Sequence, residues 1–420
     1  MKARSGVLNS NIGGNALAPL FSTGALTIAN AITDVTRLAG VEGDGATYPA
    51  SMVGVWPAAT NQILNGNCTT NATYIDPNSS ATLARSTSRY KFGATSLEIT
   101  CPGLTNSEGA NFRSGAGTAA AGEVKSAGIW VYHEASGPLN IYCQIAWRDS
   151  GGSALTPSTG TITAVSPFVW TQLTATGTAP ASTDRADVKA IKSSISVDSF
   201  WAGGIQLEAG SIATPYIETD GGTASRSAGL ITIPAAALNS PQQMWFAARM
   251  NMGFSQASPP NTGTAIFWSQ RDSATEGLLA YYNADTCYMR RDSGGFGTSA
   301  GIAATGLWSV GDDITVIGAT TSALMKISFK GAAFTTAANT TIPTLTGASR
   351  LGTDTVGLGR EPVSDYYWFA AGKGTLTDAD AALFNAWGNN DPLPHMFPRS
   401  AQLTFLARFN GDGTAYRYAA

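Results

Sequence analysis

Short runs in which apolar and polar residues alternate fill most of this 420-residue chain, separated by turns rich in glycine, proline, serine and threonine. In residues 140–148, for example, every second residue is apolar, from Ile141 to Trp147. A period of two places successive side chains on opposite faces of an extended strand. No helical period of useful length interrupts these runs between residues 60 and 217. The pattern therefore predicts an all-β chain built from antiparallel β-sandwiches.

Length and a polar link divide the chain into parts. A chain of 420 residues exceeds what one hydrophobic core normally serves. Residues 218–228 are polar and contain two glycines, which is typical of a link between domains. We therefore expect an N-terminal segment (1–55), a first sandwich (56–217), the linker (218–228), a second sandwich (229–390) and a C-terminal extension (391–420).

The expected strands share alternation and flanking turn residues. Those of the first sandwich are residues 96–100, 128–133, 140–148, 168–175, 186–191 and 199–207. Those of the second are residues 244–250, 265–270, 277–283, 286–292, 313–320, 324–329, 356–359 and 366–373. Residues 402–409 and 415–418, on either side of Asn410-Gly-Asp-Gly, predict a small C-terminal hairpin.

Two segments predict helices. Residues 377–387 begin with Thr377, a plausible N-cap, and carry Asp378 and Asp380 in the first turn. Residues 24–40 predict an N-terminal amphipathic helix between two glycines. Its apolar stripe consists of Ile28, Ile32, Val35 and Leu38. Because its surroundings are too short to enclose a core, this helix must pack either against the next domain of the chain or against another subunit.

Charge and hydropathy exclude several classes of partner. Only 13% of the residues are charged, the net charge is −3, and no basic block is present, so nucleic acid is not an expected partner. No run reaches the ~20 apolar residues of a membrane span, and the N-terminus lacks the apolar core of a secretory signal. We therefore expect no membrane insertion and a soluble chain assembled in a cytoplasm.

The spacing of the cysteine and histidine residues does not predict a metal-binding site. Cys68, Cys101, Cys143 and Cys287 lack metal-ligand spacing. A disulfide bond within the first domain is one interpretation, but buried free thiols are the favoured interpretation. The two histidines, His133 and His395, lie in different predicted regions, and His133 is expected at the surface.

No catalytic arrangement is evident in the sequence. A Ser-His-Asp site would need a histidine beside a strained nucleophile turn, and the two histidines lie in different predicted regions. Glycoside hydrolysis needs two carboxylates held ~5–10 Å apart, whereas Glu276, Asp285 and Asp292 are scattered singly. We expect no enzyme activity.

One pattern runs through the first sandwich and is most specific at its end. The segment Gly204-Ile-Gln-Leu-Glu-Ala-Gly-Ser-Ile-Ala-Thr-Pro-Tyr-Ile-Glu-Thr219 resembles the last strand and exit segment of the carbohydrate-binding-module-like jelly rolls in phage tail and fibre proteins. Residues 62–67 look like their opening strand and residues 85–100 like the second and third. Trp170-Thr-Gln-Leu and Thr178-Ala-Pro-Ala181 are similar to a later strand and turn. The resemblance implies a jelly roll in a virion, without implying that sugar binding is retained.

A second pattern covers residues 229–390. Trp308-Ser-Val-Gly-Asp-Asp-Ile-Thr-Val316, residues 324–331, Leu358-Gly-Arg360 and residues 374–380 occur in that order. They resemble strands, a hairpin and the terminal helix of laminin-G or concanavalin-A-like domains. Asp380 in place of the usual Glu, and Lys330-Gly331 without a preceding Asn, depart from that pattern. The resemblance implies a second, lectin-like sandwich.

Calcium is the one ion that such sandwiches often hold with loop oxygens, and no other cofactor is expected. The oxygen-rich candidates are Asp76, Asn78, Asp312, Asp313 and Asp354. Turn formation by the same residues is the alternative that we favour.

Outward-facing aromatic side chains are candidates for stacking on sugars. In the first sandwich the candidate platform is Trp130, Tyr132, Tyr142, Gln144 and Arg148. In the second it is Trp268, Tyr282, Tyr288 and Arg290. Core packing is the alternative, because an error of one residue in register moves each side chain to the other face.

These features predict a non-enzymatic structural protein exposed on a phage virion, as a tail fibre or appendage that attaches to host polysaccharide through lectin-like domains. The first 55 residues would dock it to other virion proteins. Low charge and many small residues favour burial between copies, so a homotrimer is expected. Two alternatives stay open, a capsid decoration or head-fibre protein without glycan binding and a polysaccharide-degrading enzyme.

Overall fold

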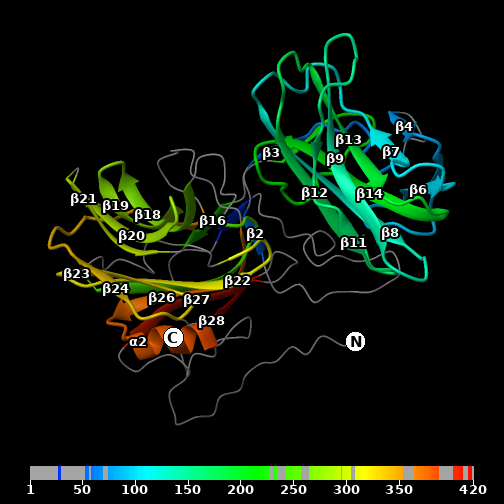
Figure 1. The fold of residues 1–420 in the computed structure, drawn as a ribbon. Coiled ribbons are helices and arrows are strands. Elements are labelled where there is room, and N and C mark those ends of the chain that lie inside the picture. Colours follow the sequence, from blue (N-terminus) through cyan, green and yellow to red (C-terminus); the bar gives the residue numbers. More distant parts are fainter. Residues whose placement is uncertain are drawn as a thin grey trace.

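The computed structural model describes residues 27–29, 53–55, 58–69, 74–226, 230–233, 243–256, 264–294, 296–303, 308–352, 364–386, 401–409 and 415–418. Within these residues the fold is all-β, as predicted, with two antiparallel β-sandwiches and one helix (Figure 1).

The first sandwich consists of two facing sheets. The five-stranded sheet has the order β12 (Thr171–Thr178), β8 (Val124–His133), β14 (Asp198–Ala209), β6 (Ser96–Cys101) and β5 (Thr82–Ser86). The six-stranded sheet has the order β10 (Ser158–Thr159), β9 (Leu139–Arg148), β13 (Arg185–Lys192), β7 (Gly109–Phe112) and β4 (Ile75–Asn78), and β11 (Thr163–Val165) also pairs with β9.

Alternation along the strands produces the core of this sandwich. Ile129 and Val131 of β8, and Ile141 and Ile145 of β9, are fully buried in one apolar cluster between the sheets. Trp147 joins them, and its Nε1 donates a hydrogen bond to Ser158 Oγ at 3.0 Å. The inward residues predicted for residues 128–133 and 140–148 are confirmed.

The segment after β14 is held by buried polar side chains. Gln206 Oε1 accepts a hydrogen bond from Ile217 N at 2.6 Å, and Gln206 Nε2 donates to Thr214 O at 3.0 Å. Glu208 accepts hydrogen bonds from the backbone N–H and the hydroxyl of Thr214. The most specific motif of the sequence therefore contains a latch (Gln206, Glu208 and Thr214) that folds the exit segment back onto the sheet.

The chain enters the first sandwich one strand earlier than predicted. β3 (Ala59–Asn61) pairs with β15 (Ala224–Arg226), whereas residues 64–67 form a turn. The side chain of Asn61 donates hydrogen bonds to Ile205 O and Ile217 O. The predicted opening strand over residues 62–67 is therefore wrong. The strand ends at Asn61, whose side-chain hydrogen bonds fix the chain immediately before the turn. Part of the predicted linker is strand β15.

The second sandwich also has two sheets. One has the order β1 (Thr27–Ala29), β16 (Leu230–Ile233), β25 (Ser349–Leu351), β18 (Thr264–Ser273), β19 (Glu276–Asn283), β20 (Thr286–Ser293) and β21 (Phe296–Ala303). The other has the order β24 (Thr335–Ala338), β23 (Leu324–Phe329), β22 (Asp313–Thr320), β17 (Met244–Met252), β26 (Ser364–Gly374), β27 (Ala401–Phe409) and β28 (Ala415–Tyr418), and β2 (Val53–Val55) also pairs with β26. Their core includes Phe246 stacked on Trp268 at a ring-centroid distance of 4.7 Å.

Both terminal segments contribute strands to the second sandwich. β1 pairs with β16, with Ile28 opposite Ile231, and β2 pairs with β26. The predicted helix over residues 24–40 is therefore wrong at residues 27–29, where backbone pairing to a sheet edge replaces helical hydrogen bonds. The remainder of that segment, with Ile32, Val35 and Leu38, lies outside the described residues. The predicted C-terminal hairpin is confirmed by β27 and β28, and β27 extends the sheet at β26.

The predicted C-terminal helix is confirmed as α2 (Asp378–Ala386). Thr377 N and Thr377 Oγ1 both donate hydrogen bonds to Asp380 Oδ2, at 2.7 and 2.8 Å, as in a capping box. Phe384 packs against Trp245 of β17, in the sheet that also contains β22 and β26, with ring centroids 5.5 Å apart. The helix thus covers the outer side of that sheet (Figure 1).

Replacing Asp380 with alanine is expected to destabilise the second sandwich by about 1 kcal/mol, because the cap of α2 loses its acceptor. Urea unfolding followed by tryptophan fluorescence measures the change. Leu383→Ala, at an exposed position of the same helix, serves as the control and is expected to cost less than ~0.5 kcal/mol. Equal losses in the two variants would show that the cap contributes nothing specific.

Candidate functional site

The platform predicted for the first sandwich is divided between its two outer surfaces. Trp130 and Tyr132 lie on β8 of the five-stranded sheet, whereas Tyr142, Gln144 and Arg148 lie on β9 of the six-stranded sheet. The prediction of one shared surface is therefore wrong. Alternation identifies the outward residues of each strand, but it does not show that consecutive strands belong to opposite sheets.

Aromatic side chains on the five-stranded sheet pack mainly on one another. Tyr132 and Trp170 are 3% and 4% exposed, with ring centroids 5.5 Å apart. Trp201 meets Tyr132 edge-on at 5.9 Å, and the Lys91 ammonium lies 4.5 Å from the centre of the Trp130 ring. These ring faces are occupied by neighbouring side chains, so this surface stabilises the fold more than it offers a stacking platform.

The platform predicted for the second sandwich is only partly at the surface. Trp268 and Tyr282 belong to the core cluster, so their assignment as outward residues is wrong. A bulge in β18 between Ile266 and Trp268 shifts the register and turns Trp268 inward. Burial raises the pKa of Tyr282 to about 12.

Tyr288 and Arg290 do alternate with the core residues of β20. The Tyr288 ring stacks on that of Tyr281 at 5.2 Å, and Arg290 Nε pairs with Asp292 at 2.7 Å. Of the four residues predicted for this platform, two are therefore buried and two are engaged by neighbours.

The outer surface of the six-stranded sheet in the first sandwich is different, because it carries many hydrogen-bonding groups. In the register, Arg185 lies opposite Arg148, Lys189 lies opposite both Gln144 and Asn111, and Asn111 lies opposite Asp76. Directly paired residues share one face of an antiparallel sheet. We call this surface the polar face; it consists of Asp76, Asn78, Asn111, Arg113, Tyr142, Gln144, Arg148, Arg185, Asp187 and Lys189.

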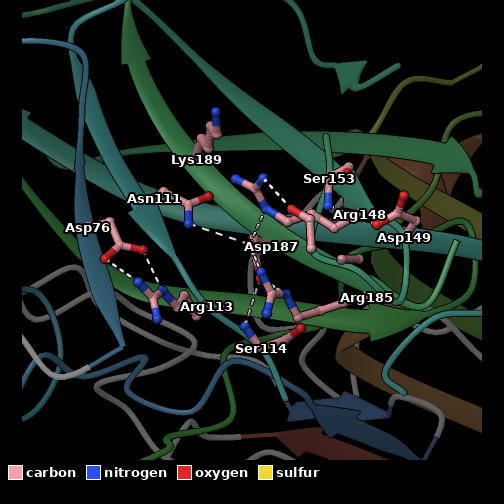
Figure 2. Close-up of polar contacts among 12 residues, drawn as sticks. Asp76, Asn111, Arg113, Ser114, Arg148, Asp149, Ser153, Arg185, Asp187 and Lys189 are labelled. Atoms are coloured by element: carbon pink, nitrogen blue, oxygen red, sulfur yellow. Dashed lines mark hydrogen bonds and ion pairs between the residues drawn. The ribbon is translucent and has the colours of Figure 1, made fainter. Parts of the chain in front are cut away.

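Asp187 of β13 is the centre of the polar face (Figure 2). Its side chain is completely buried. Arg148 Nε and Arg185 Nε each lie 3.2 Å from a carboxylate oxygen, Ser114 N donates at 3.2 Å, and Asn111 Nδ2 donates at 3.5 Å. One buried carboxylate thus fixes two guanidinium groups from neighbouring strands.

Two further contacts fix the edge of the polar face at β4. Asp76 and Arg113 form a bidentate ion pair, and this hydrogen bonding raises the pKa of Arg113. Lys189 Nζ donates a hydrogen bond to Asn78 Oδ1 at 3.0 Å. Burial lowers the pKa of Lys189, and the nearby positive charge of Arg148 lowers it further.

Tyr142 and Gln144 supply the part of the polar face that was predicted as a binding surface. Tyr142 is half-buried and lies opposite Ile191, and burial raises the pKa of its hydroxyl. Gln144 Nε2 donates to Thr159 Oγ1 at 3.0 Å. The structure therefore brings Tyr142, Gln144 and Arg148 together beside charged residues that were not predicted. The missed signal was Arg185-Ala-Asp-Val-Lys189, in which every second residue of a strand is charged.

The histidine and cysteine side chains within the described residues are buried. His133 was predicted at the surface, which is wrong, because its Nε2 lies 2.8 Å from Val165 O and its Nδ1 accepts a hydrogen bond from Ala135 N. His395 lies outside the described residues. All four cysteines are buried and unpaired, as favoured, and burial raises the pKa of Cys143 to about 12.

The oxygen-rich residues considered for calcium are engaged by protein groups. Asp76 pairs with Arg113, and Asn78 binds Lys189. Asp312 accepts from Ser309 N at 2.9 Å, and Asp313 accepts from Asn251 Nδ2 at 2.8 Å. Asp354 lies outside the described residues. In the part of the chain that the structure describes, no three His, Cys, Asp or Glu side chains are grouped to hold a metal ion. Nor does that part contain a helix long and apolar enough to cross a membrane.

Comparison with known proteins finds no family description and no characterised protein that matches the sequence. Among solved structures, the tandem family 22 carbohydrate-binding modules of xylanase Xyn10C from Paenibacillus barcinonensis are 10% identical, with a TM-score of 0.31, covering 76% of this chain and 97% of that chain. The family 22 module and catalytic module of a Clostridium thermocellum xylanase, complexed with xylohexaose, are 14% identical over 36% of this chain, with a TM-score of 0.31. The enzymatically active domain of tailspike protein 4 from bacteriophage CBA120 is 15% identical over 36% of this chain, with a TM-score of 0.27. The chain spans 28% and 21% of the lengths of these last two proteins.

Proposed function

We propose that the first sandwich is a non-catalytic carbohydrate-binding module, that the polar face is its binding surface, and that the chain is displayed on a bacteriophage particle for attachment to host polysaccharide. The observation that carries the binding proposal is the arrangement around Asp187. It holds donors from β7, β9 and β13 at fixed positions on the sheet surface that also carries the half-buried ring of Tyr142.

This arrangement matches what a sugar requires. Saccharides offer hydroxyl groups in fixed directions and apolar patches on the ring, so they bind where prearranged polar groups lie beside an aromatic surface. Strand positions are more rigid than loop positions, which limits the entropy lost on binding. Gln144 and Arg148 point outward from the same strand as Tyr142 and place amide and guanidinium groups within one surface.

The carboxylates of the polar face support binding in preference to catalysis. Asp187 is buried and already accepts from two arginines, Asn111 and Ser114. Asp76 is held by Arg113. A general acid or nucleophile must be free to reach the glycosidic bond, and neither carboxylate is.

The virion setting rests on the sequence. The Gly204–Thr219 segment and the low charge of the chain support a place on a phage particle, where other virion proteins hold the chain and copies associate as a homotrimer. Failure of the first sandwich to bind any glycan would favour the capsid decoration or head-fibre alternative.

Replacing Tyr142 with alanine is expected to weaken glycan binding about 10-fold, because a stacked ring contributes roughly 1–1.5 kcal/mol. Full-length protein is screened on an array of bacterial polysaccharides, and the affinity for the strongest ligand is measured by calorimetry. Gln144→Ala is expected to lose affinity as well. Gln172→Ala, an exposed glutamine on the other sheet, is the matched control and should bind normally. Equal binding by the Tyr142, Gln144 and Gln172 variants would place the binding surface elsewhere.

A further inference from the structure

Lys189 is a charged side chain of the polar face whose partners do not balance its charge. The hydrogen bond of its ammonium goes to the amide oxygen of Asn78, a neutral acceptor. The carboxylate nearest to it on the same strand, Asp187, already pairs with Arg148 and Arg185. The positive charge of Lys189 is therefore not neutralised by a carboxylate of its own.

Arg148 places a second cation on the same surface as Lys189. The two lie on paired strands and point to the same side of the sheet, with Lys189 opposite Gln144 and Arg148 four residues further along β9. Burial lowers the pKa of Lys189 and the positive charge of Arg148 lowers it further, whereas the charge of Asp187 acts in the opposite direction. Two like charges held half-buried on one surface repel each other, and an anion placed between them relieves that repulsion.

The contacts that hold Arg148 in place favour the binding of an anion. Asp187 fixes the guanidinium of Arg148 through its Nε, and Arg148 Nη1 donates to Gly152 O at 3.3 Å. The side chain of Arg148 nevertheless remains 23% exposed. Rigid, partly desolvated cations bind carboxylates and phosphates more strongly than mobile surface cations do.

We propose that the polar face selects acidic polysaccharides, with Lys189 and Arg148 binding the anionic group of one sugar residue while Tyr142 and Gln144 contact the ring or its neighbour. This inference deepens the proposed glycan binding and rests on it. The shared chemistry is an anion carried on a saccharide, either a uronic acid carboxylate or a phosphate ester.

The test compares one matched pair of ligands that differ in charge alone, together with a second acidic polymer. Full-length protein is titrated with polygalacturonate, with the same polymer after carboxyl reduction, and with a glycerol-phosphate teichoic acid. Binding to at least one acidic polymer is expected to be 10-fold or more tighter than binding to the reduced polymer, and to weaken as salt rises from 50 to 500 mM. A preference for polygalacturonate identifies the carboxylate as the source of the anion, and a preference for teichoic acid identifies the phosphate.

Variants locate the charge that is responsible. Lys189→Met and Arg148→Met are each expected to reduce the affinity for the acidic polymer about 10-fold. Arg85→Met removes an exposed charge from β5 on the other sheet and should leave that affinity unchanged. Circular dichroism and urea unfolding of each variant separate a loss of ligand contact from a loss of fold.

The outcomes distinguish the inference from the proposed function. Equal affinity for charged and carboxyl-reduced polymers would overturn the selection of acidic sugars and leave glycan binding standing. Acidic-polymer binding that survives both Lys189→Met and Arg148→Met would place the anion elsewhere and also overturn the inference. Absence of binding to all three polymers and to the polysaccharide array would overturn both.

Discussion

Replacing Asp187 with alanine is expected to lower the free energy of unfolding of the first sandwich by about 3 kcal/mol. The substitution leaves Arg148 and Arg185 without their shared carboxylate, and the N–H of Ser114 without its acceptor. Removing one partner from a buried ion pair typically costs ~3–5 kcal/mol. We expect the lower end, because the two arginine side chains are 23% and 27% exposed and can recover some hydration. Urea unfolding monitored by tryptophan fluorescence measures the change.

Two variants show whether charge or shape is responsible. Asp187→Asn keeps an acceptor for Ser114 and the size of the side chain, so it is expected to lose about 1–2 kcal/mol. Asp149→Ala removes a carboxylate that accepts from Ser153 N in a turn after β9, and should cost less than ~1 kcal/mol. If Asp187→Ala were no worse than Asp149→Ala, the carboxylate of Asp187 could not be what organises the polar face.

The strands of both sandwiches were largely predictable, because burial on one face leaves a period of two in the sequence. β22 and β23 have the predicted bounds, residues 313–320 and 324–329. Strands without this alternation were missed. β7 (Gly-Ala-Asn-Phe) is buried on both faces, and β24 (Thr-Thr-Ala-Ala) has no large apolar residue. Neither composition distinguishes a strand from a loop.

Sheet membership was the information that alternation could not supply. The inward and outward residues of β8 and β9 were assigned correctly, yet the two strands lie in opposite sheets. A platform that combined their outward residues therefore could not form. In β18 a single bulge was enough to bury Trp268, since one extra residue reverses the facing of everything beyond it.

For a related reason, only part of the polar face could be predicted from the sequence. Tyr142, Gln144 and Arg148 were found because they alternate with a strong apolar stripe in one strand. Asp187 was missed because its role depends on groups brought together from β7 and β9, which are distant in the sequence. The terminal segments show the same dependence, since β1 and β2 pair with strands some 200 to 300 residues away.

Replacing Glu208 with alanine is expected to cost about 3 kcal/mol, because the latch that holds the exit segment loses its central acceptor. Glu208 Oε2 accepts the Thr214 hydroxyl at 2.8 Å and Oε1 accepts Gln206 Nε2 at 2.9 Å, and the N–H of Thr214 also donates to the carboxylate. All three residues are buried, so each donor left without a partner costs roughly 1–3 kcal/mol. Urea unfolding measures the loss. Exposed Glu134→Ala, which removes a surface ion pair with Arg89, is the control and should cost less than ~1 kcal/mol.

The pH dependence of the same latch has a definite sign. Burial raises the pKa of Glu208 above its usual value of about 4.3, although hydrogen bonds from Thr214 and Gln206 oppose the shift. A carboxyl whose pKa is raised by folding favours the protonated form in the folded state, so its contribution to stability is complete below the unfolded pKa and is lost as pH rises through the folded pKa. The uncharged Glu208→Gln variant should therefore gain stability relative to the natural protein between pH 4 and pH 7. Parallel urea unfolding of both proteins across this range measures the difference, which cancels the titration of all other groups. A constant difference would mean that Glu208 ionises equally well in the folded and unfolded chains, and that burial does not control this carboxylate.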